Sequence, residues 1–303
     1  MLFLYVQLMK NNPIGIFDSG IGGLTVANAI KKVLPNEDFI YFGDTEHLPY
    51  GEKSKEAILR FSKNIIRFLI NKDCKAIVIA CNSASSVIND NLLKYANNKI
   101  VFNVIDPVVK LAVELANDGK SSAVETLKVG VIGTKATIGS KIYTKKIEEF
   151  CLDFNNGYED DSEGQRYLTQ SYNVPSIKSL ATPLLAPMIE EGFINDEISK
   201  KVIQNYLSDP ILKNIDMLIL ACTHYPLIYN KIKEYYNGEK IVIDSSEIVA
   251  EHIERVLKAK NLLNNKVKTN HQFYVSNYTK SFEQSTRFFF KEGVKLEEVN
   301  IHQ

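Results

Sequence analysis

The chain has 303 residues, of which 36 are basic and 36 acidic, and 45% are apolar, so it carries no formal net charge. This composition is that of a folded globular protein, and it excludes intrinsic disorder and fibrous repeats. The length predicts two domains of roughly 150 residues each. A neutral chain lacks the basic excess that nucleic acids and anionic membranes require, so a small molecule is the expected partner.

The N-terminal segment and the cysteines indicate a cytoplasmic protein. Residues 1–10 include a short apolar run but lack the basic segment and cleavage site of a signal peptide, and no stretch is apolar enough to span a membrane. We interpret residues 1–8 as an extension upstream of a second start at Met9. The scattered cysteines and the lack of a Cys-x-x-Cys pair predict reduced thiols. The four are Cys74, Cys81, Cys151 and Cys222, of which we interpret Cys74 and Cys151 as structural.

Short apolar runs rich in β-branched residues alternate with segments of helical period, which is typical of a parallel sheet with crossover helices. The expected strands are residues 14–17, 39–42, 76–80, 100–105, 129–132, 217–221 and 241–243. Apolar residues recur at spacings of 3, 4 and 4 from Ile58 to Leu69, which predicts one face of a helix. Asp106 and Pro107 predict the N-cap and first position of another helix. The fold class is therefore α/β.

Two segments of the chain are repeated in the same order. Residues 14–19 match residues 129–134 in pattern, and residues 76–81 match residues 217–222. The matches predict two similar α/β halves, each with a cysteine at the carboxyl end of a strand. In open α/β sheets, ligands bind at that edge.

The first candidate site is the Asp-Ser-Gly-Ile-Gly-Gly sequence of residues 18–23, where a strand turns into a helix. Its glycines let backbone N–H groups approach a ligand. The dinucleotide fingerprint requires a further glycine where Thr25 stands, so NAD is disfavoured. Asp18 is either a functional carboxylate or a plain N-cap.

The next polar loop, residues 44–54, has a Pro-Tyr-Gly turn at its centre. It either closes over a ligand or is a turn followed by a helix cap.

Cys81 follows a predicted strand and precedes the cap-forming residues Asn82 and Ser83. Nearby helical N–H groups favour a thiolate there, although a buried inert cysteine is the alternative. A tyrosine-phosphatase loop would carry an arginine where Val87 stands, which disfavours phosphate-ester chemistry.

Cys222 and His224 lie two residues apart at the end of another predicted strand, and Pro226 prevents the strand from continuing. A thiol and an imidazole in one turn suggest acid–base or nucleophilic chemistry. Zinc would need two further ligands, and the other histidines lack the spacing to supply them, so no metal is expected. The acidic segment 153–173 is interpreted as a solvated surface loop.

These motifs together resemble glutamate racemase, a family of the aspartate/glutamate racemase superfamily, and the resemblance extends from Ile14 to about Val299. The matching segments are Gly-Ile-Phe-Asp-Ser-Gly-Ile-Gly-Gly-Leu-Thr-Val (15–26), Tyr-Phe-Gly-Asp-Thr with Pro-Tyr-Gly (41–51), Ala-Cys-Asn-Ser-Ala-Ser (80–85), Pro-Leu-Leu-Ala-Pro-Met-Ile-Glu-Glu-Gly (183–192) and Ala-Cys-Thr-His-Tyr-Pro-Leu (221–227). Ser83 replaces the threonine usual in the family, and residues 118–126 and 153–173 resemble insertions.

The resemblance implies a cytoplasmic, cofactor-independent homodimer that supplies D-glutamate for peptidoglycan and binds glutamate between two α/β domains. The first domain would comprise residues 1–106 and 225–303, and the second residues 107–224. Cys81 would deprotonate D-glutamate, assisted by Asp18, and Cys222 would deprotonate L-glutamate, assisted by His224 with Glu190 nearby. The implied substrate-binding residues are Asp18, Ser19, Tyr50, Gly51, Asn82, Ser83, Thr223 and His224.

Proton chemistry agrees with this assignment. Inverting a stereocentre requires a base on one face and an acid on the other, and two thiols can exchange these roles because the reference pKa of cysteine is near 8.5. We also expect backbone N–H groups at the strand-to-helix turns to stabilise the developing carbanion. The alternatives are a racemase of aspartate or another amino acid, and a two-domain solute-binding protein without chemistry.

Overall fold

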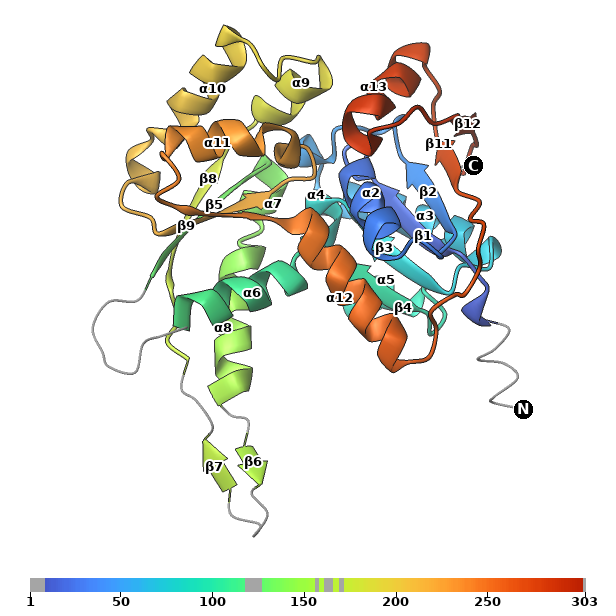
Figure 1. Cartoon of the computed structure of the whole chain (residues 1–303), viewed down its shortest axis with the longest axis horizontal. Helices are drawn as coiled ribbons and strands as arrows, with labels where there is room; N and C mark the ends of the chain where they lie inside the picture. Colours follow the sequence, from blue (N-terminus) through green and yellow to red (C-terminus); the bar gives the residue numbers. More distant parts are fainter. Residues whose placement is uncertain (1–8, 118–126, 156–157, 161–165, 169–171, 302–303) are drawn as a thin grey trace.

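Two separate parallel sheets organise the chain, confirming the α/β class (Figure 1). The structure is a computed structural model that describes residues 9–117, 127–155, 158–160, 166–168 and 172–301. The proposed N-terminal extension, residues 1–8, and the proposed insertion 118–126 therefore lie outside the described residues, and the insertion 153–173 is described only in part. The described part of that segment includes β6 (Tyr158–Asp160) and β7 (Arg166–Leu168), which pair as an antiparallel hairpin.

The first sheet has six strands in the order β12-β11-β2-β1-β3-β4, and all its described pairings are parallel. Its strands are β1 (Ile14–Asp18), β2 (Phe39–Gly43), β3 (Ala76–Ile79), β4 (Ile100–Asn103), β11 (Gln272–Val275) and β12 (Glu297–Glu298). The helical segments that accompany it are α2 (Leu24–Val33), η1 (Tyr50–Glu52), α3 (Lys55–Asn71), α4 (Asn82–Ser85), α5 (Asp90–Lys94) and α13 (Lys280–Phe290).

The second sheet has four parallel strands in the order β10-β9-β5-β8. Its strands are β5 (Lys128–Gly133), β8 (Ser176–Ala181), β9 (Met217–Ala221) and β10 (Ile241–Asp244). The helical segments around it are α6 (Asp106–Asn117), α7 (Lys135–Gly139), α8 (Ile142–Asn155), α9 (Leu185–Glu190), α10 (Glu197–Leu207), η2 (Pro210–Leu212), η3 (Tyr225–Ile228) and α11 (Tyr229–Tyr235). Helix α12 (Ser245–Ala259) packs against both α2 and α6 and so bridges the two sheets (Figure 1).

The domain boundary expected at residue 225 needs a correction. Strand β10 follows that boundary, yet it pairs with β9 and extends the second sheet. The chain returns to the first sheet only through α12 and then β11, which pairs with β2. The physical reason is that Val242 and Ile243 pair with Leu218 and Ile219 of β9, so β10 buries both of its faces at the edge of the second sheet.

Local signals account for the main elements. Each expected strand is present, with small differences at its ends. The apolar stripe from Ile58 to Leu69 lies buried on α3, and Ser54 caps this helix by accepting a hydrogen bond from the Ala57 amide. Asp106 is the first residue of α6 rather than its N-cap, because the Asn103 side chain accepts the hydrogen bond from the Asp106 amide.

The repeated segments occupy equivalent places in the two sheets. Strands β1 and β3 pair with Ile14 beside Ala76, and β5 and β9 pair with Val129 beside Met217. These four residues are the first of each matched segment, so the whole repeat is in the same register. The duplication predicted from the sequence is confirmed, and it aligns Cys81 with Cys222.

A buried ion pair fixes the end of the first sheet opposite the cysteines. Lys75, just before β3, is fully buried and contacts Glu37 with 2.5 Å between Nζ and Oε2. The same ammonium donates to the carbonyls of Lys10 and Leu262, at 2.9 and 2.7 Å. One side chain thus ties together the N-terminal segment, β3 and the connection that follows α12.

Candidate active site

Both sheets contribute to a cavity of about 260 Å³ at the carboxyl ends of their strands. Every residue that the resemblance assigned to the site lines this cavity, except Asp18. The lining residues are Ser19, Leu48, Pro49, Tyr50, Gly51, Cys81, Asn82, Ser83, Thr134, Ala186, Pro187, Glu190, Cys222, Thr223 and His224. The cavity therefore brings a buried cysteine from each sheet into one space.

The Cys81 thiol is at the N-terminus of α4, as its sequence context predicted. Its Sγ accepts a hydrogen bond from the Ala84 amide at 3.5 Å and donates one to Ser19 Oγ at 3.7 Å. Burial, the alternative that the sequence left open, has the larger effect on this thiol. Burial, followed by the charge of Asp18, raises the pKa of Cys81 to about 12 and outweighs the hydrogen bonds that favour the anion. Cys81 is thus a neutral thiol that can donate a proton.

Asp18 lies behind the cavity wall and is completely buried. It accepts a hydrogen bond from the Gly20 amide at 2.9 Å, and Thr223 Oγ1 lies 3.5 Å from its other oxygen. Burial raises its pKa, although the charge of His224 and backbone N–H groups act in the opposite direction. Asp18 is not the N-cap of α2, because Gly23 occupies that position. Its carboxylate instead links the Cys81 side of the cavity to Thr223.

The glycines after Asp18 allow close packing across the cavity. A Cβ atom on Gly22 would lie 2.5 Å from His224 Nδ1 and 2.7 Å from Thr223 Oγ1. Only glycine leaves room for the His224 ring at this point. The glycine-rich turn therefore brings the first sheet against the second, in addition to exposing its backbone N–H groups.

Cys222 ends β9 and belongs to a chain of three polar groups. Its Sγ lies 3.6 Å from His224 Nδ1, and His224 Nε2 lies 2.7 Å from Glu190 Oε1 at the end of α9. Burial alone lowers the pKa of His224, but the hydrogen bonds and charges of Cys222 and Glu190 raise it well above its usual range. The imidazolium donates from both ring nitrogens, so it places positive charge beside the Cys222 sulfur.

The remaining assigned residues are held by specific contacts. The Tyr50 hydroxyl donates a hydrogen bond to Asp44 Oδ2 at 2.6 Å. Gly51 packs on Thr134, where a Cβ atom would approach within 2.7 Å. Ser83, which replaces the threonine usual in the family, keeps a hydroxyl group. Its Oγ lies 2.9 Å from Oγ1 of Thr134, the residue that follows β5 of the second sheet. The Pro-Tyr-Gly loop thus lines the cavity, and its last residue, Ser54, caps α3, so the turn and helix cap expected from the sequence are also present.

Sequence reasoning missed several residues of the cavity. Thr134 was not singled out, although it aligns with Ser19 in the internal repeat and that alignment was available as a signal. Ala186 and Pro187 stand on α9 one turn before Glu190, on the segment that carried the resemblance. Pro49 belongs to the Pro-Tyr-Gly motif but was not assigned to the site, and Leu48 had no signal beyond its place beside that motif.

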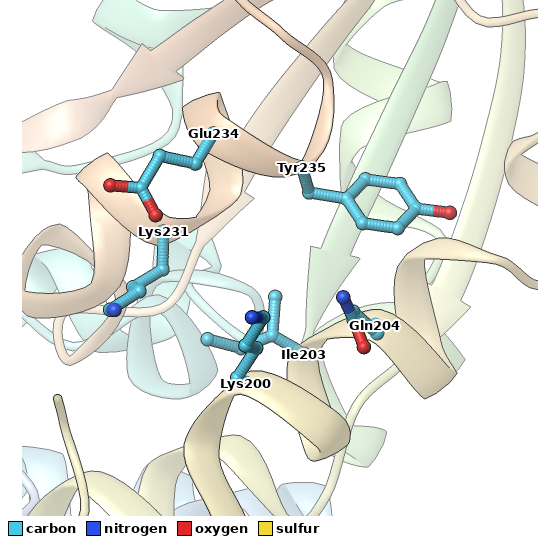
Figure 2. Close-up of a pocket in the computed structure, with 6 residues that line it drawn as sticks. All are labelled: Lys200, Ile203, Gln204, Lys231, Glu234 and Tyr235. Atoms are coloured by element: carbon cyan, nitrogen blue, oxygen red, sulfur yellow. The ribbon is translucent and has the colours of Figure 1, made fainter. Parts of the chain in front are cut away.

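A second pocket lies away from the thiols, between α10 and α11 (Figure 2). Its volume is about 110 Å³, and its polar side chains include Lys200, Lys231 and Glu234. It contains none of the residues that the sequence singled out. Within the described ranges, no cluster of three histidine, cysteine or acidic side chains has the arrangement to hold a metal ion.

The described helices also include none that is long and apolar enough to cross a membrane. Cys74 and Cys151 are buried and have no disulfide partner. Burial raises the pKa of Cys74 to about 12, with the charge of Lys99 acting in the opposite direction. Neither cysteine lines the cavity, in agreement with a structural role.

Two matched α/β units therefore each contribute one buried thiol to a shared cavity, an arrangement that offers two proton-carrying groups to one bound molecule. The chain belongs to the Asp/Glu/hydantoin racemase family, whose model matches residues 24–253. It is therefore an isomerase, of a family that acts without pyridoxal phosphate.

The similar proteins align with nearly the whole chain. Glutamate racemase 3 of Caldanaerobacter subterraneus is 35% identical over 294 residues, covering 97% of this chain and 96% of that protein. The crystal structure of glutamate racemase from Francisella tularensis in complex with D-glutamate is 34% identical, with a TM-score of 0.82 and coverage of 96% and 98%. The isoform RacE1 from Bacillus anthracis gives 30% identity, a TM-score of 0.82 and coverage of 97% and 99%. The α/β architecture expected from the sequence is thus confirmed.

Proposed function

We propose that this protein interconverts L- and D-glutamate by proton transfer between two cysteines, without a cofactor. The observation that carries the proposal is the cavity shared by Cys81 and Cys222, which end equivalent strands of the two sheets. The similarity to named glutamate racemases over 96–97% of the chain supports glutamate as the substrate. A racemase needs an acid and a base on opposite faces of one carbon, and two equivalent thiols meet this requirement.

In the direction from L- to D-glutamate, Cys222 is the base and Cys81 the acid. The Cys222 thiolate takes the α-proton, so the C–H bond breaks and an S–H bond forms while the electron pair stays on the α-carbon. The Cys81 thiol then gives its proton to the opposite face of that carbon. The charges at the site support these starting states, because burial keeps Cys81 protonated and the His224 imidazolium places positive charge 3.6 Å from the Cys222 sulfur.

The carbanion and the substrate carboxylates need donors, and the cavity offers several. Asn82 Nδ2 is buried and has no hydrogen-bond partner among the described residues. Ser19, Ser83 and Thr223 add hydroxyls, and the turns after β1 and β3 present backbone N–H groups. We assign substrate binding to these groups together with Tyr50, Gly51 and His224. Donors placed in a water-poor cavity stabilise developing charge more strongly than water does.

The resemblance to glutamate racemases also bears on the location, assembly and biological role of the protein. We infer that the enzyme is a cytoplasmic homodimer that provides D-glutamate for peptidoglycan. We also propose that each sheet is the core of one domain, with the second domain extended to include β10.

The test is to incubate the purified protein with L-glutamate in D₂O, without added pyridoxal phosphate or metal, and to follow α-deuteration and circular dichroism. We expect optical activity to disappear and D-glutamate to carry deuterium at the α-carbon. Cys81→Ala and Cys222→Ala should each reduce the rate by at least about 10³-fold, in the range of lost acid–base catalysis. Full activity in either variant would refute the two-thiol mechanism. Racemisation of L-aspartate instead of L-glutamate would refute the substrate assignment.

A further inference from the structure

A buried hydrogen bond joins the second unit to a substrate-binding residue of the first. Tyr143, in the first turn of α8, donates from its hydroxyl to Asn82 Oδ1 at 2.7 Å. Both side chains are 2% exposed. Asn82 follows Cys81 directly and lines the cavity, whereas Tyr143 does not line it. Tyr143 therefore acts on the cavity only through the residues it touches.

This contact determines how the amide of Asn82, a residue of the cavity wall, is oriented. A side-chain amide has an acceptor oxygen and a donor nitrogen, and a rotation of 180° exchanges them. With Oδ1 bound to Tyr143, the Nδ2 donors have no partner among the described residues. The rotated amide would leave the Tyr143 proton without its acceptor and would place an oxygen where the Nδ2 donors now are. A buried donor without an acceptor is costly, so the tyrosine favours one orientation.

We propose that Tyr143 is a positioning residue that orients the Asn82 amide so that its N–H donors bind a carboxylate of the substrate. This inference rests on the proposed function, because glutamate provides the carboxylate. An amide oxygen in the same place would repel that carboxylate. A residue from the part of the chain around the second sheet thereby determines whether Asn82, which follows β3 of the first sheet, offers donors or an acceptor to the substrate.

The properties of the phenol suit this role. Burial, with a smaller contribution from the charge of Cys222, raises the pKa of Tyr143 above its usual range. The hydroxyl therefore keeps its proton near neutral pH and can donate it to Asn82 Oδ1. The residue sits on a helix of fourteen residues, which gives the hydroxyl a fixed position.

The experiment compares the steady-state kinetics of the full-length wild type and Tyr143→Phe with L-glutamate. We expect the KM to rise about tenfold and kcat to change less than about threefold, because the carboxylate is bound in both the ground state and the transition state. Tyr274→Phe is the matched control. It also removes a buried hydroxyl, which donates to Gln272 Oε1 at 2.8 Å, but it lies on β11 away from the cavity. Its KM should equal that of the wild type.

A double-mutant cycle separates positioning from a general structural effect. In an Asn82→Ala background, Tyr143→Phe should leave the KM unchanged, because no amide remains to be oriented. An equal rise of KM in both backgrounds, or an unchanged KM in the single variant, would overturn the proposal.

Asn82→Asp provides an independent test if Tyr143→Phe does not fold. It retains an acceptor for Tyr143 but replaces the donors in the cavity with a negative oxygen, so the KM should rise by more than about tenfold. An unchanged KM in this variant also overturns the proposal. A wild type that does not racemise glutamate refutes the proposed function instead, so the two failures are distinguishable.

Discussion

Replacing Glu190 by glutamine should lower the pKa of His224 and narrow the pH range of activity. The Glu190 carboxylate lies 2.7 Å from His224 Nε2, and its hydrogen bond and charge both favour the imidazolium. A hydrogen bond to a charged group contributes about 1.5–3 kcal/mol, and 1.36 kcal/mol corresponds to one pKa unit. The Glu190 side chain is 26% exposed, so we take the lower end and expect the His224 pKa to fall by about one unit.

The assay is the pH dependence of kcat/KM for L-glutamate, which reports the ionisations of the free enzyme. Activity from L-glutamate requires the imidazolium beside Cys222, so the rate falls as pH rises through the His224 pKa. In Glu190→Gln this alkaline decline should begin about one pH unit lower. Glu191→Gln is the control, since Glu191 is the exposed neighbour that caps α9 without contacting His224. An alkaline decline that stays in place in Glu190→Gln, or that moves equally in Glu191→Gln, would refute the reasoning.

Two further substitutions test the close contact at Gly22 and the buried ion pair of Lys75 with Glu37. Gly22→Ala would place a methyl group 2.5 Å from His224 Nδ1, so the ring must move and kcat should fall about tenfold to a hundredfold; wild-type rates would contradict the close packing. Glu37→Gln leaves the buried Lys75 ammonium without its counter-charge, and the free energy of unfolding measured in urea should fall by about 3–5 kcal/mol. Glu114→Gln, in an exposed ion pair, should change it by less than about 0.5 kcal/mol, and equal effects of the two variants would argue against a special role of burial.

The sequence was sufficient for strands that are buried on both faces. Strands β1, β3 and β9 consist of fully buried residues, and such runs stand out from their polar surroundings. Strand β8 was not predicted, because it lies at the edge of its sheet and its residues Ser176–Ala181 are only partly buried, so no apolar run marks it. Strand β10 was predicted but placed in the wrong half, since a short apolar run carries no information about which sheet it joins.

The sequence predicted those site residues that lie in short local motifs at the ends of strands. The internal repeat placed Cys81 and Cys222 at the carboxyl ends of strands, where ligands bind in parallel sheets, but their convergence on one site came from the resemblance. Glu190 came from the resemblance alone, because α9 is distant in sequence from His224. Tyr143 could not be predicted, since its contact with Asn82 depends on how the two sheets face each other. The sequence left open whether the helix N-terminus or burial has the larger effect on Cys81, and burial outweighs the helix N-terminus.

The register match between the two sheets has a thermodynamic consequence. It aligns Asp18 with Gly133 and Ser19 with Thr134, so the two thiols have unequal surroundings although their strands are equivalent. L- and D-glutamate are mirror images with equal free energies in water, and their equilibrium constant is therefore unity. By the Haldane relationship, an enzyme that interconverts them must have the same kcat/KM for both. The unlike neighbours of Cys81 and Cys222 can consequently make kcat and KM differ between the enantiomers only by the same factor: the enantiomer with the higher KM must have the proportionally higher kcat.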